Sequence, residues 1–325
     1  MLIEKLHVDE VDIDTDRVAA MVADQFPVWA GTSLEPVYPA STDNVMFILN
    51  RHFGVRLPRT PAAARSLERE LVHAPRLAPM LPARIPAPVG IGRPAEGYPF
   101  KWFISRWIEG GNPVPGRPDH PIPNRLAVDV ARFARALHSV VPPPASEELF
   151  SYRGDRSVRP READTRAAIG RCGDHFDTAA LHRAWDVAVE APEGTGPPSW
   201  IHTDLHPGNL LVKHGRLEGV LDWGGLAVGD PAIDLIVAWN LFGPEEREVF
   251  RAEMKADDGT WARGRAWALS VGLVAFPYYV HTNRALAAVS WYQIGQVLAE
   301  LTEADLPATR GAARQDVSAW RPPPA

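Results

Sequence analysis

Residues 200–212 read WIHTDLHPGNLLV and place two histidines, an aspartate and an asparagine between apolar ends. This polar stretch has two interpretations. His202, Asp204 and His206 could be metal ligands, because alternate residues of an extended strand share one face. Alternatively, Asp204 could be the base and Asn209 the metal-holding residue of a phosphoryl-transfer loop. The remainder of the chain has to decide between them.

The composition sets limits on the class of protein. At 325 residues the chain is long for a single core, so two lobes are expected. The formal net charge of −6 gives no electrostatic support for binding nucleic acid. A single cysteine, Cys172, excludes a disulfide framework and a zinc site built from cysteines.

The apolar segments give no sign of membrane insertion or export. The amino-terminal residues are acidic and lack the basic start and apolar centre of a secretory signal. The most apolar stretch, residues 266–280, is shorter than the roughly 20 residues that span a bilayer. We therefore expect a cytoplasmic protein, a monomer or a homodimer, that acts without membrane or nucleic acid.

Hydrophobic periodicity predicts a strand-rich first part and a helical second part. Helices are expected at residues 11–26 and 61–81, two strands within 37–59, and a hairpin within 89–111. The proline-rich residues 113–123 form the best linker. Helical patterns follow at 123–140, 178–191, 231–242 and 261–301, a short hairpin is expected at 215–225, and the charged run 244–258 has the pattern of a solvated helix face. This organisation predicts a bilobal α+β protein, with lobes at 1–108 and 109–325.

The spacing of polar residues favours the phosphoryl-transfer interpretation. Asn209 follows Asp204 by five residues, and Asp222-Trp223-Gly224 follows at the next expected hairpin. The protein-kinase loop H-R-D-L-x-x-x-N, followed by D-F-G, has the same order. A hydroxyl nucleophile needs a carboxylate that accepts its proton, which Asp204 would supply. Mg²⁺ takes one or two oxygen ligands from a protein, which Asn209 and Asp222 would supply.

At this point the chain resembles the aminoglycoside phosphotransferase family of small-molecule kinases, whose usual loop is H-G-D-L-H-x-x-N. The resemblance extends to STDNVMF at 41–47, GVRLPR at 54–59 and LERELVHAPRLAPMLP at 67–82. It implies a protein-kinase-like fold with a small strand-rich amino-terminal lobe and a larger helical carboxy-terminal lobe. It also implies ATP or GTP between the lobes, Mg²⁺, and phosphate transfer to a hydroxyl of a small molecule such as an antibiotic or related natural product.

The resemblance also implies roles for individual residues in binding the nucleotide. Arg56 stands where such kinases have the strand lysine that grips the α- and β-phosphates, with Glu70 as its helix partner and Glu68 as the alternative. Backbone at Arg106 and Ile108 would meet the adenine edge. The loop over the phosphates would comprise Ser41, Thr42, Asp43 and Asn44.

Several residues depart from the family's usual sequence. Thr203 replaces a glycine, Ser41 stands where many relatives have glycine, and Trp223 replaces phenylalanine. Arg56 replaces lysine, and its planar fork can grip two oxygens where an ammonium acts as a point charge. These departures concern nucleotide affinity and turnover rate, because every group that the chemistry requires is present.

The acceptor site of this family is formed by the carboxy-terminal helices. Between residues 266 and 299 the only formal charge is Arg284, whereas a polycationic aminoglycoside would need several carboxylates. We therefore expect a neutral or amphipathic acceptor. The candidate contacts are Trp239, Tyr278, Tyr279 and Asn283, although the aromatic residues here could instead be helix-packing core.

Two other functions stay open. One is a kinase-fold protein that binds a small molecule or nucleotide with little turnover, for which Thr203 and Arg56 are the motivation. The other is a metal-dependent hydrolase that uses His202, Asp204 and His206. His206 and Asp230 otherwise fit positions that brace the loop, and Asp230 and Asp234 could simply cap the following helix.

Overall fold

The computed structural model describes residues 5, 10–38, 43–95, 97–117, 119–144 and 149–304. The chain divides into two compact units. Unit 1 comprises Met1–Glu109 and Gly219–Leu226, and unit 2 comprises Gly110–Glu218 and Ala227–Ala325. The segment 219–226, which the expected lobe at 109–325 included, therefore groups with unit 1. Main-chain pairing of Gly219 with Arg84 holds this segment there.

Unit 1 is built on a five-stranded sheet in which neighbouring strands are antiparallel. The strands are β1 (Leu34–Pro36), β2 (Asn44–Leu49), β3 (Phe53–Pro58), β4 (Pro88–Gly92) and β5 (Trp102–Arg106), in the order β1-β2-β3-β5-β4. The turn between β2 and β3 is made by Asn50 and Arg51, both with positive φ. The two strands expected within 37–59 and the hairpin within 89–111 are confirmed.

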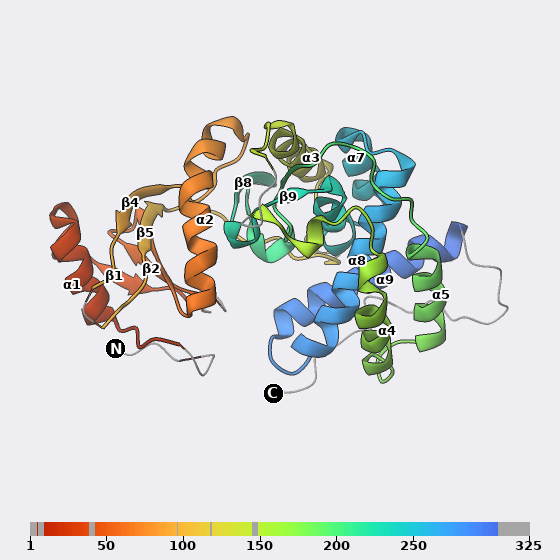
Figure 1. The fold of residues 1–325 in the computed structure, drawn as a ribbon, viewed down its shortest axis with the longest axis horizontal. Helices are drawn as coiled ribbons and strands as arrows, with labels where there is room; N and C mark the ends of the chain where they lie inside the picture. The colour runs from red at the N-terminus through yellow and green to blue at the C-terminus, as the bar shows by residue number, and fades with distance from the viewer. Residues whose placement is uncertain are drawn as a thin grey trace. The chain divides into compact units, whose positions relative to one another are not determined.

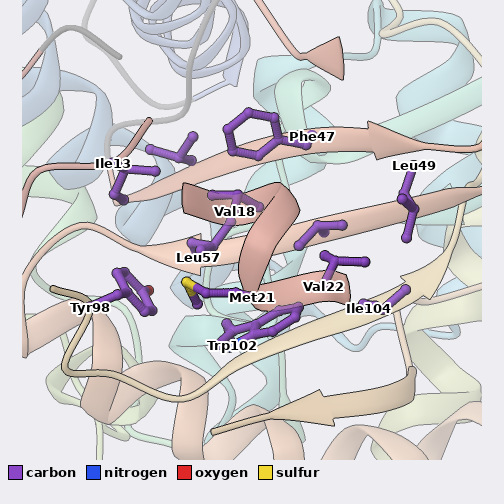
Figure 2. Close-up of a cluster of buried hydrophobic side chains, with 12 residues drawn as sticks. Ile13, Val18, Met21, Val22, Phe47, Leu49, Leu57, Tyr98, Trp102 and Ile104 are labelled. Atoms are coloured by element: carbon purple, nitrogen blue, oxygen red, sulfur yellow. The ribbon is translucent and has the colours of Figure 1, made fainter. Parts of the chain in front are cut away.

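One face of this sheet is covered by α1 (Thr15–Gln25). The Asp14 side chain caps α1 by accepting the N–H of Arg17 at 2.8 Å. Val18, Met21 and Val22 of α1 then pack against the sheet, as Figure 2 shows. The cluster is completed by Ile13, Val45, Phe47, Leu49, Val55, Leu57, Tyr98, Trp102 and Ile104.

The opposite face of the sheet is covered by α2 (Pro61–Leu77), as Figure 1 shows. Successive side chains of a strand point to opposite faces. Val55 and Leu57 therefore join the cluster under α1, whereas Arg56 reaches Glu70 of α2. Short 3₁₀ helices, η1 (Pro27–Trp29) and η2 (Ala78–Met80), complete the described secondary structure of this unit together with η7 (Trp223–Gly225).

Unit 2 is mainly helical. Its helices are α3 (Asn124–Ser139), α4 (Glu162–Arg171), α5 (Thr178–Ala188), α6 (Val237–Asn240), α7 (Pro244–Met254), α8 (Asp258–Tyr279) and α9 (Arg284–Ala304). β6 (Ser199–Ile201) pairs with β9 (Ala227–Gly229). β7 (Leu210–Lys213) pairs with β8 (Arg216–Val220), which carries the chain from unit 2 into unit 1. In the described part of the chain, no helix has the length and hydrophobicity needed to cross a membrane.

Three expected helical segments differ in detail. Residues 231–242 begin as a 3₁₀ helix, η8 (Pro231–Ile236), and only the short α6 follows. Residues 261–301 form two helices, because the chain turns at 280–283 and Asn283 caps α9 by accepting the N–H of Leu286 at 3.1 Å. The charged run does form α7, but Arg247 is buried and pairs with Glu300 at 2.9 Å, so this face is only partly solvated.

Candidate active site

The loop that carries Asp204 in unit 2 is held by a buried carboxylate. Asp234 accepts the main-chain N–H of His202 at 3.0 Å and of Thr203 at 2.8 Å. Thr203 has a φ of 72°, which a β-branched residue adopts only under strain. The two hydrogen bonds to Asp234 therefore hold a conformation that glycine would adopt without strain.

Asp204 itself is surrounded by cationic and polar groups. Its Oδ1 accepts from Arg153 Nη1 at 2.7 Å, and its Oδ2 lies 3.5 Å from His206 Nε2. Burial alone would raise the pKa of Asp204, but His206 and Arg153 outweigh it and hold the pKa well below its ordinary value. The carboxyl group is therefore ionised at neutral pH and can accept a hydrogen bond from an incoming hydroxyl.

Arg153 is a residue that the sequence analysis missed. It lies on η4 (Tyr152–Gly154), and its Nη1 also donates to the main-chain oxygen of Thr203 at 2.9 Å. The backbone of η4 lies very close to that of β9. A Cβ added at Gly229 would lie only 2.6 Å from Cα of Gly154, so glycine is needed here. The only sequence signal was a group of arginines at 153–161, without spacing that points to a partner.

Asn209 is oriented by hydrogen bonds from one side of its amide. Nδ2 donates to the main-chain oxygen of Asp204 at 2.9 Å and to its Oδ2 at 3.3 Å. These bonds leave Oδ1, the atom that would hold a cation, on the other side of the planar amide. His206 caps the surrounding turn, η6 (Pro207–Asn209), by accepting the N–H of Gly208 at 3.0 Å. The side chain of Asn112, which was not predicted to belong to the site, donates to the main-chain oxygens of residues 207, 208 and 210.

Unit 1 contains a buried ion pair that leads to Asp222. Arg56 Nη1 donates to both carboxylate oxygens of Glu70, at 2.9 and 2.7 Å. Arg56 Nη2 lies 3.4 Å from Oδ1 of Asp222, whose side chain is 43% exposed. Glu68 instead pairs with Lys101 at 3.1 Å in an exposed position. Of the two expected helix partners, Glu70 is therefore the one that contacts Arg56.

Burial and pairing have opposite effects on the two charges of this pair. Burial would lower the pKa of Arg56, but Glu70, Asp222 and Asp43 raise it, so the guanidinium stays charged. Burial raises the pKa of Glu70 to about 7, although Arg56 acts in the opposite direction. Arg56 is thus a cation held in place by a carboxyl group that titrates near neutral pH.

The other expected nucleotide contacts lie in or beyond the sheet of unit 1. Ser41 and Thr42 lie outside the described residues. The main-chain oxygen of Asp43 accepts the N–H of Arg59 at 2.9 Å, and Asn44 begins β2 with a buried side chain. The exposed Arg106 ends β5, and the side chain of Ile108 is buried.

The four expected acceptor contacts are not equivalent in unit 2. Tyr278 and Tyr279 line a cavity of about 480 Å³ to which Arg153 also contributes. Trp239 is fully buried, packs on Trp261 and donates its Nε1 to Glu300 at 2.7 Å. In this structure the indole of Trp239 therefore belongs to the core of unit 2, and Trp239 is not among the residues that line the cavity of Tyr278 and Tyr279. Asn283 serves as the cap of α9 described above.

The geometry does not bring the three candidate ligands of a hydrolase together. Within the described ranges, no group of three or more His, Cys, Asp and Glu side chains is arranged to hold a metal ion. His202 is fully buried, whereas His206 caps η6 and faces Asp204. This arrangement favours the phosphoryl-transfer interpretation of the polar stretch.

The strand-rich unit with its Arg56–Glu70 pair and the helical unit with its Asp204–Asn209 loop define a bilobal, kinase-like α+β protein. Residues 37–267, more than half of the chain, match the phosphotransferase enzyme family. The chain therefore belongs to this family of enzymes, and both the resemblance and the fold class expected from the sequence are confirmed.

Two curated relatives match parts of the chain. An aminoglycoside 3'-phosphotransferase of Escherichia coli is 28% identical over 149 residues, which are 44% of this chain and 53% of the relative. The uncharacterized protein YcbJ of Bacillus subtilis (strain 168) is 42% identical over 74 residues, 22% of each chain. The chain thus spans about half of the length of the first relative and about a fifth of the second.

Solved structures share the fold over nearly their whole length. The GDP complex of aminoglycoside 2'-phosphotransferase-IIIa has a TM-score of 0.64 at 18% identity, covering 89% of this chain and 99% of that one. Macrolide 2'-phosphotransferase MphH from Brachybacterium faecium has a TM-score of 0.60 at 19% identity, covering 91% and 99%. At these identities the likeness concerns the fold.

Proposed function

We propose that the protein transfers the γ-phosphoryl group of ATP or GTP to a hydroxyl of a small molecule, an antibiotic or related natural product. The observation that carries the proposal is the environment of Asp204. An ionised carboxylate lies beside Asn209, on a loop whose conformation is fixed by Asp234. A base that must be oriented and ionised at neutral pH needs these features.

In the proposed reaction one phosphorus–oxygen bond forms and one breaks. The acceptor hydroxyl donates its hydrogen bond to Asp204, which takes the proton as the oxygen attacks the γ-phosphorus. A new phosphorus–oxygen bond forms to the acceptor, and the bond from the γ-phosphorus to the bridging oxygen breaks. The nucleoside diphosphate leaves with the electron pair. The products are a phosphate monoester and the diphosphate.

The phosphate side of the reaction is assigned to unit 1. Arg56 would grip phosphate oxygens through its planar guanidinium, and Glu70 fixes its orientation. We assign the backbone of Arg106 and Ile108 to the adenine edge, and the segment from Ser41 to Asn44 to the phosphates. Asp43 and Asn44 directly precede or begin β2, so they would approach the phosphates from the same strand end.

Asn209 and Asp222 have the donor atoms that fit Mg²⁺. Both offer hard oxygen ligands, and the hydrogen bonds of Asn209 Nδ2 turn its Oδ1 away from Asp204. A bound Mg²⁺ would neutralise charge on the phosphate oxygens. We therefore assign Asn209 and Asp222 as the residues that would hold Mg²⁺.

The relatives support the choice of cosubstrate and acceptor class. Structures of similar aminoglycoside phosphotransferases are described with GDP, ADP or ATP, and one is a complex with kanamycin. Other similar structures are macrolide 2'-phosphotransferases. Together these names support a nucleoside triphosphate as donor and a hydroxylated natural product as acceptor.

The experiment is a phosphorylation screen with ATP and with GTP across hydroxylated natural-product antibiotics, read by mass spectrometry. The expected result is a Mg²⁺-dependent gain of one phosphoryl group on at least one acceptor. The Asp222→Asn variant should lose this gain, whereas Asp186→Asn, a surface control, should keep it. A wild-type protein that binds nucleotide but modifies no acceptor would favour the binding-protein function instead.

A further inference from the structure

The cavity of about 480 Å³ in unit 2 has a wall of unusual composition for a kinase that would accept polycations. Three arginines line it, Arg153, Arg161 and Arg171, together with Tyr152, Tyr278 and Tyr279. Aliphatic side chains of α8 between residues 271 and 277 complete the lining. No aspartate or glutamate is among these described lining residues. The volume is in the range of small-molecule sites, roughly 300–1,000 Å³.

The charges around the cavity leave an excess of positive charge. Arg153 is paired with Asp204 at 2.7 Å, and Arg161 with Asp164 at 2.6 Å. Arg171, at the exposed end of α4, forms no ion pair within the part of the chain that the structure describes. Such a wall attracts an anion and repels an ammonium group.

Aromatic contacts hold two of the guanidinium groups in place. The Tyr152 ring lies 5.1 Å from Cζ of Arg161 and 6.0 Å from Cζ of Arg153. Nε of Arg153 also donates to the Tyr152 hydroxyl at 3.3 Å. Because these contacts orient the arginines before a ligand arrives, less conformational freedom is lost when an anion binds.

Arg153 connects the cavity to the proposed base. Its Nη1 donates to Asp204, and its Nε donates to Tyr152. Among the described residues, Nη2 of Arg153 has no hydrogen-bond partner, so it can donate to a ligand oxygen. An anionic group bound there would lie one guanidinium away from the Asp204 carboxylate.

The other side of the cavity is apolar. The Tyr278 side chain is 68% exposed, and its ring meets that of Tyr279 edge to face, with centroids 4.8 Å apart. An exposed aromatic ring next to aliphatic side chains offers a surface to an apolar or aromatic body. The wall therefore combines anion-binding groups with a hydrophobic surface.

We infer that this cavity binds the acceptor through an anionic group, a carboxylate or phosphate, carried on an apolar or aromatic body. Arg153, Arg161 and Arg171 would bind the anion, and Tyr278 would contact the body. The role of this ligand as acceptor rests on the function proposed above. The inference assigns the acceptor to anionic hydroxyl compounds, and it excludes polycationic aminoglycosides as good substrates.

The test uses three probes that share one aromatic secondary alcohol and differ in charge. They are mandelate (anionic), mandelamide (neutral) and 2-amino-1-phenylethanol (cationic), and binding to the full-length protein is measured by NMR titration without nucleotide. We expect mandelate to bind roughly tenfold more tightly than mandelamide, the gain of a charge-assisted hydrogen bond, and the amine to bind most weakly. Phenyl phosphate, titrated in the same way, distinguishes a phosphate-preferring site from a carboxylate-preferring one.

The matched variants are Arg171→Glu and Arg76→Glu. Both arginines are exposed and lie in the last turn of a helix, but Arg76 is on α2 and does not line the cavity. Arg171→Glu should abolish the preference for mandelate, and Arg76→Glu should keep it. The inference is overturned if mandelamide or the amine binds wild type as tightly as mandelate, or if Arg171→Glu keeps the preference.

The binding measurement separates this inference from the proposed function. If mandelate binds as expected but no acceptor is ever phosphorylated, the anion site stands and the phosphotransferase proposal fails. If the screen finds phosphorylation of cationic aminoglycosides, with no preference for anionic probes, the phosphotransferase proposal stands and the anion site fails.

Discussion

Glu70 illustrates how burial changes the chemistry of a single residue. Its side chain is fully buried and accepts two hydrogen bonds from Arg56. Taking a carboxylate out of water raises its pKa, and here the pKa reaches about 7 from an ordinary value of 4.5. The cation that is proposed to grip phosphate is therefore held by a group that changes charge near physiological pH.

This pKa predicts a specific pH dependence of stability. Between about pH 4.5 and pH 7 the folded protein holds a proton on Glu70 that the unfolded chain has lost. The contribution of Glu70 to the free energy of unfolding therefore falls as the pH rises through this window. Relative to wild type, Glu70→Gln should gain about 2 kcal/mol between pH 5 and pH 8, measured by urea unfolding.

The control for this measurement is Glu68→Gln, since Glu68 lies on the same helix but is exposed. Its difference from wild type should stay constant over the same pH range. An equally constant difference for Glu70→Gln would mean that Glu70 ionises at its ordinary pKa, and the described effect of burial would be incorrect.

At the residue scale, the sequence predicted the candidate site residues better than the contacts that these residues make. The roles of Asp204, Asn209 and Asp222 could be predicted from the sequence, because kinase chemistry fixes both the residue types and their spacing. The contact of Arg153 with Asp204 could not be predicted, since the two residues are 51 positions apart in the chain. The burial of Trp239 in the core was not predicted, because sequence periodicity does not distinguish an aromatic side chain in a helix-packed core from one that lines a cavity.

At the scale of elements, the position of Arg153 depends on the contact between η4 and β9. Gly154 and Gly229 let the two backbones approach closely, and Asp230 N donates to Gly154 O at 2.9 Å. Gly229→Ala would place a methyl group against backbone that cannot move independently. We expect it to lower the free energy of unfolding by about 1–3 kcal/mol and to weaken phosphate transfer, as Arg153 moves from Asp204.

The matched control is Gly170→Ala in α4, where an added Cβ meets no atom within 4 Å. This substitution should be neutral or stabilising by up to about 1 kcal/mol, because alanine favours helix. Thermal unfolding of both variants provides the comparison. Equal stability of Gly229→Ala and wild type would show that the two backbones are not tightly packed.

Elements with strong local signals were predicted well from sequence. The helix expected at 11–26 is observed as α1, which spans Thr15–Gln25 and buries Val18, Met21 and Val22. The two strands expected within 37–59 are observed as β2 and β3. The 3₁₀ form of η8 was not predicted. Its residues 232–236 are all buried, and a continuous buried run does not distinguish a 3₁₀ helix from an α-helix. The grouping of 219–226 with unit 1 depends on pairing with Arg84, a contact distant in sequence.

At the scale of the whole molecule, binding of nucleotide and Mg²⁺ should stabilise the fold. A ligand that binds only the folded protein adds about 3 kcal/mol to the free energy of unfolding at 100 times its Kd. We therefore expect ATP or GTP to raise Tm, and to raise it further when Mg²⁺ is present. The measurement is thermal unfolding with nucleotide, with and without Mg²⁺.

The contribution of Asp222 can be separated in the same experiment. Asp222→Asn should keep a Tm increase from nucleotide but lose the additional increase from Mg²⁺. Asp186→Asn, which changes an exposed ion pair, should behave as wild type. A Mg²⁺ effect of full size in Asp222→Asn would remove this carboxylate from the proposed metal ligands.

The most direct test of the central claim is the turnover number of Asp204→Asn with an acceptor found in the screen, measured beside nucleotide affinity. Asparagine keeps the size of the side chain but cannot accept the proton of the hydroxyl. We predict that kcat falls by at least roughly 100-fold while the Kd for the Mg²⁺-nucleotide stays within about twofold. Turnover at the wild-type rate would contradict the assignment of Asp204 as the base.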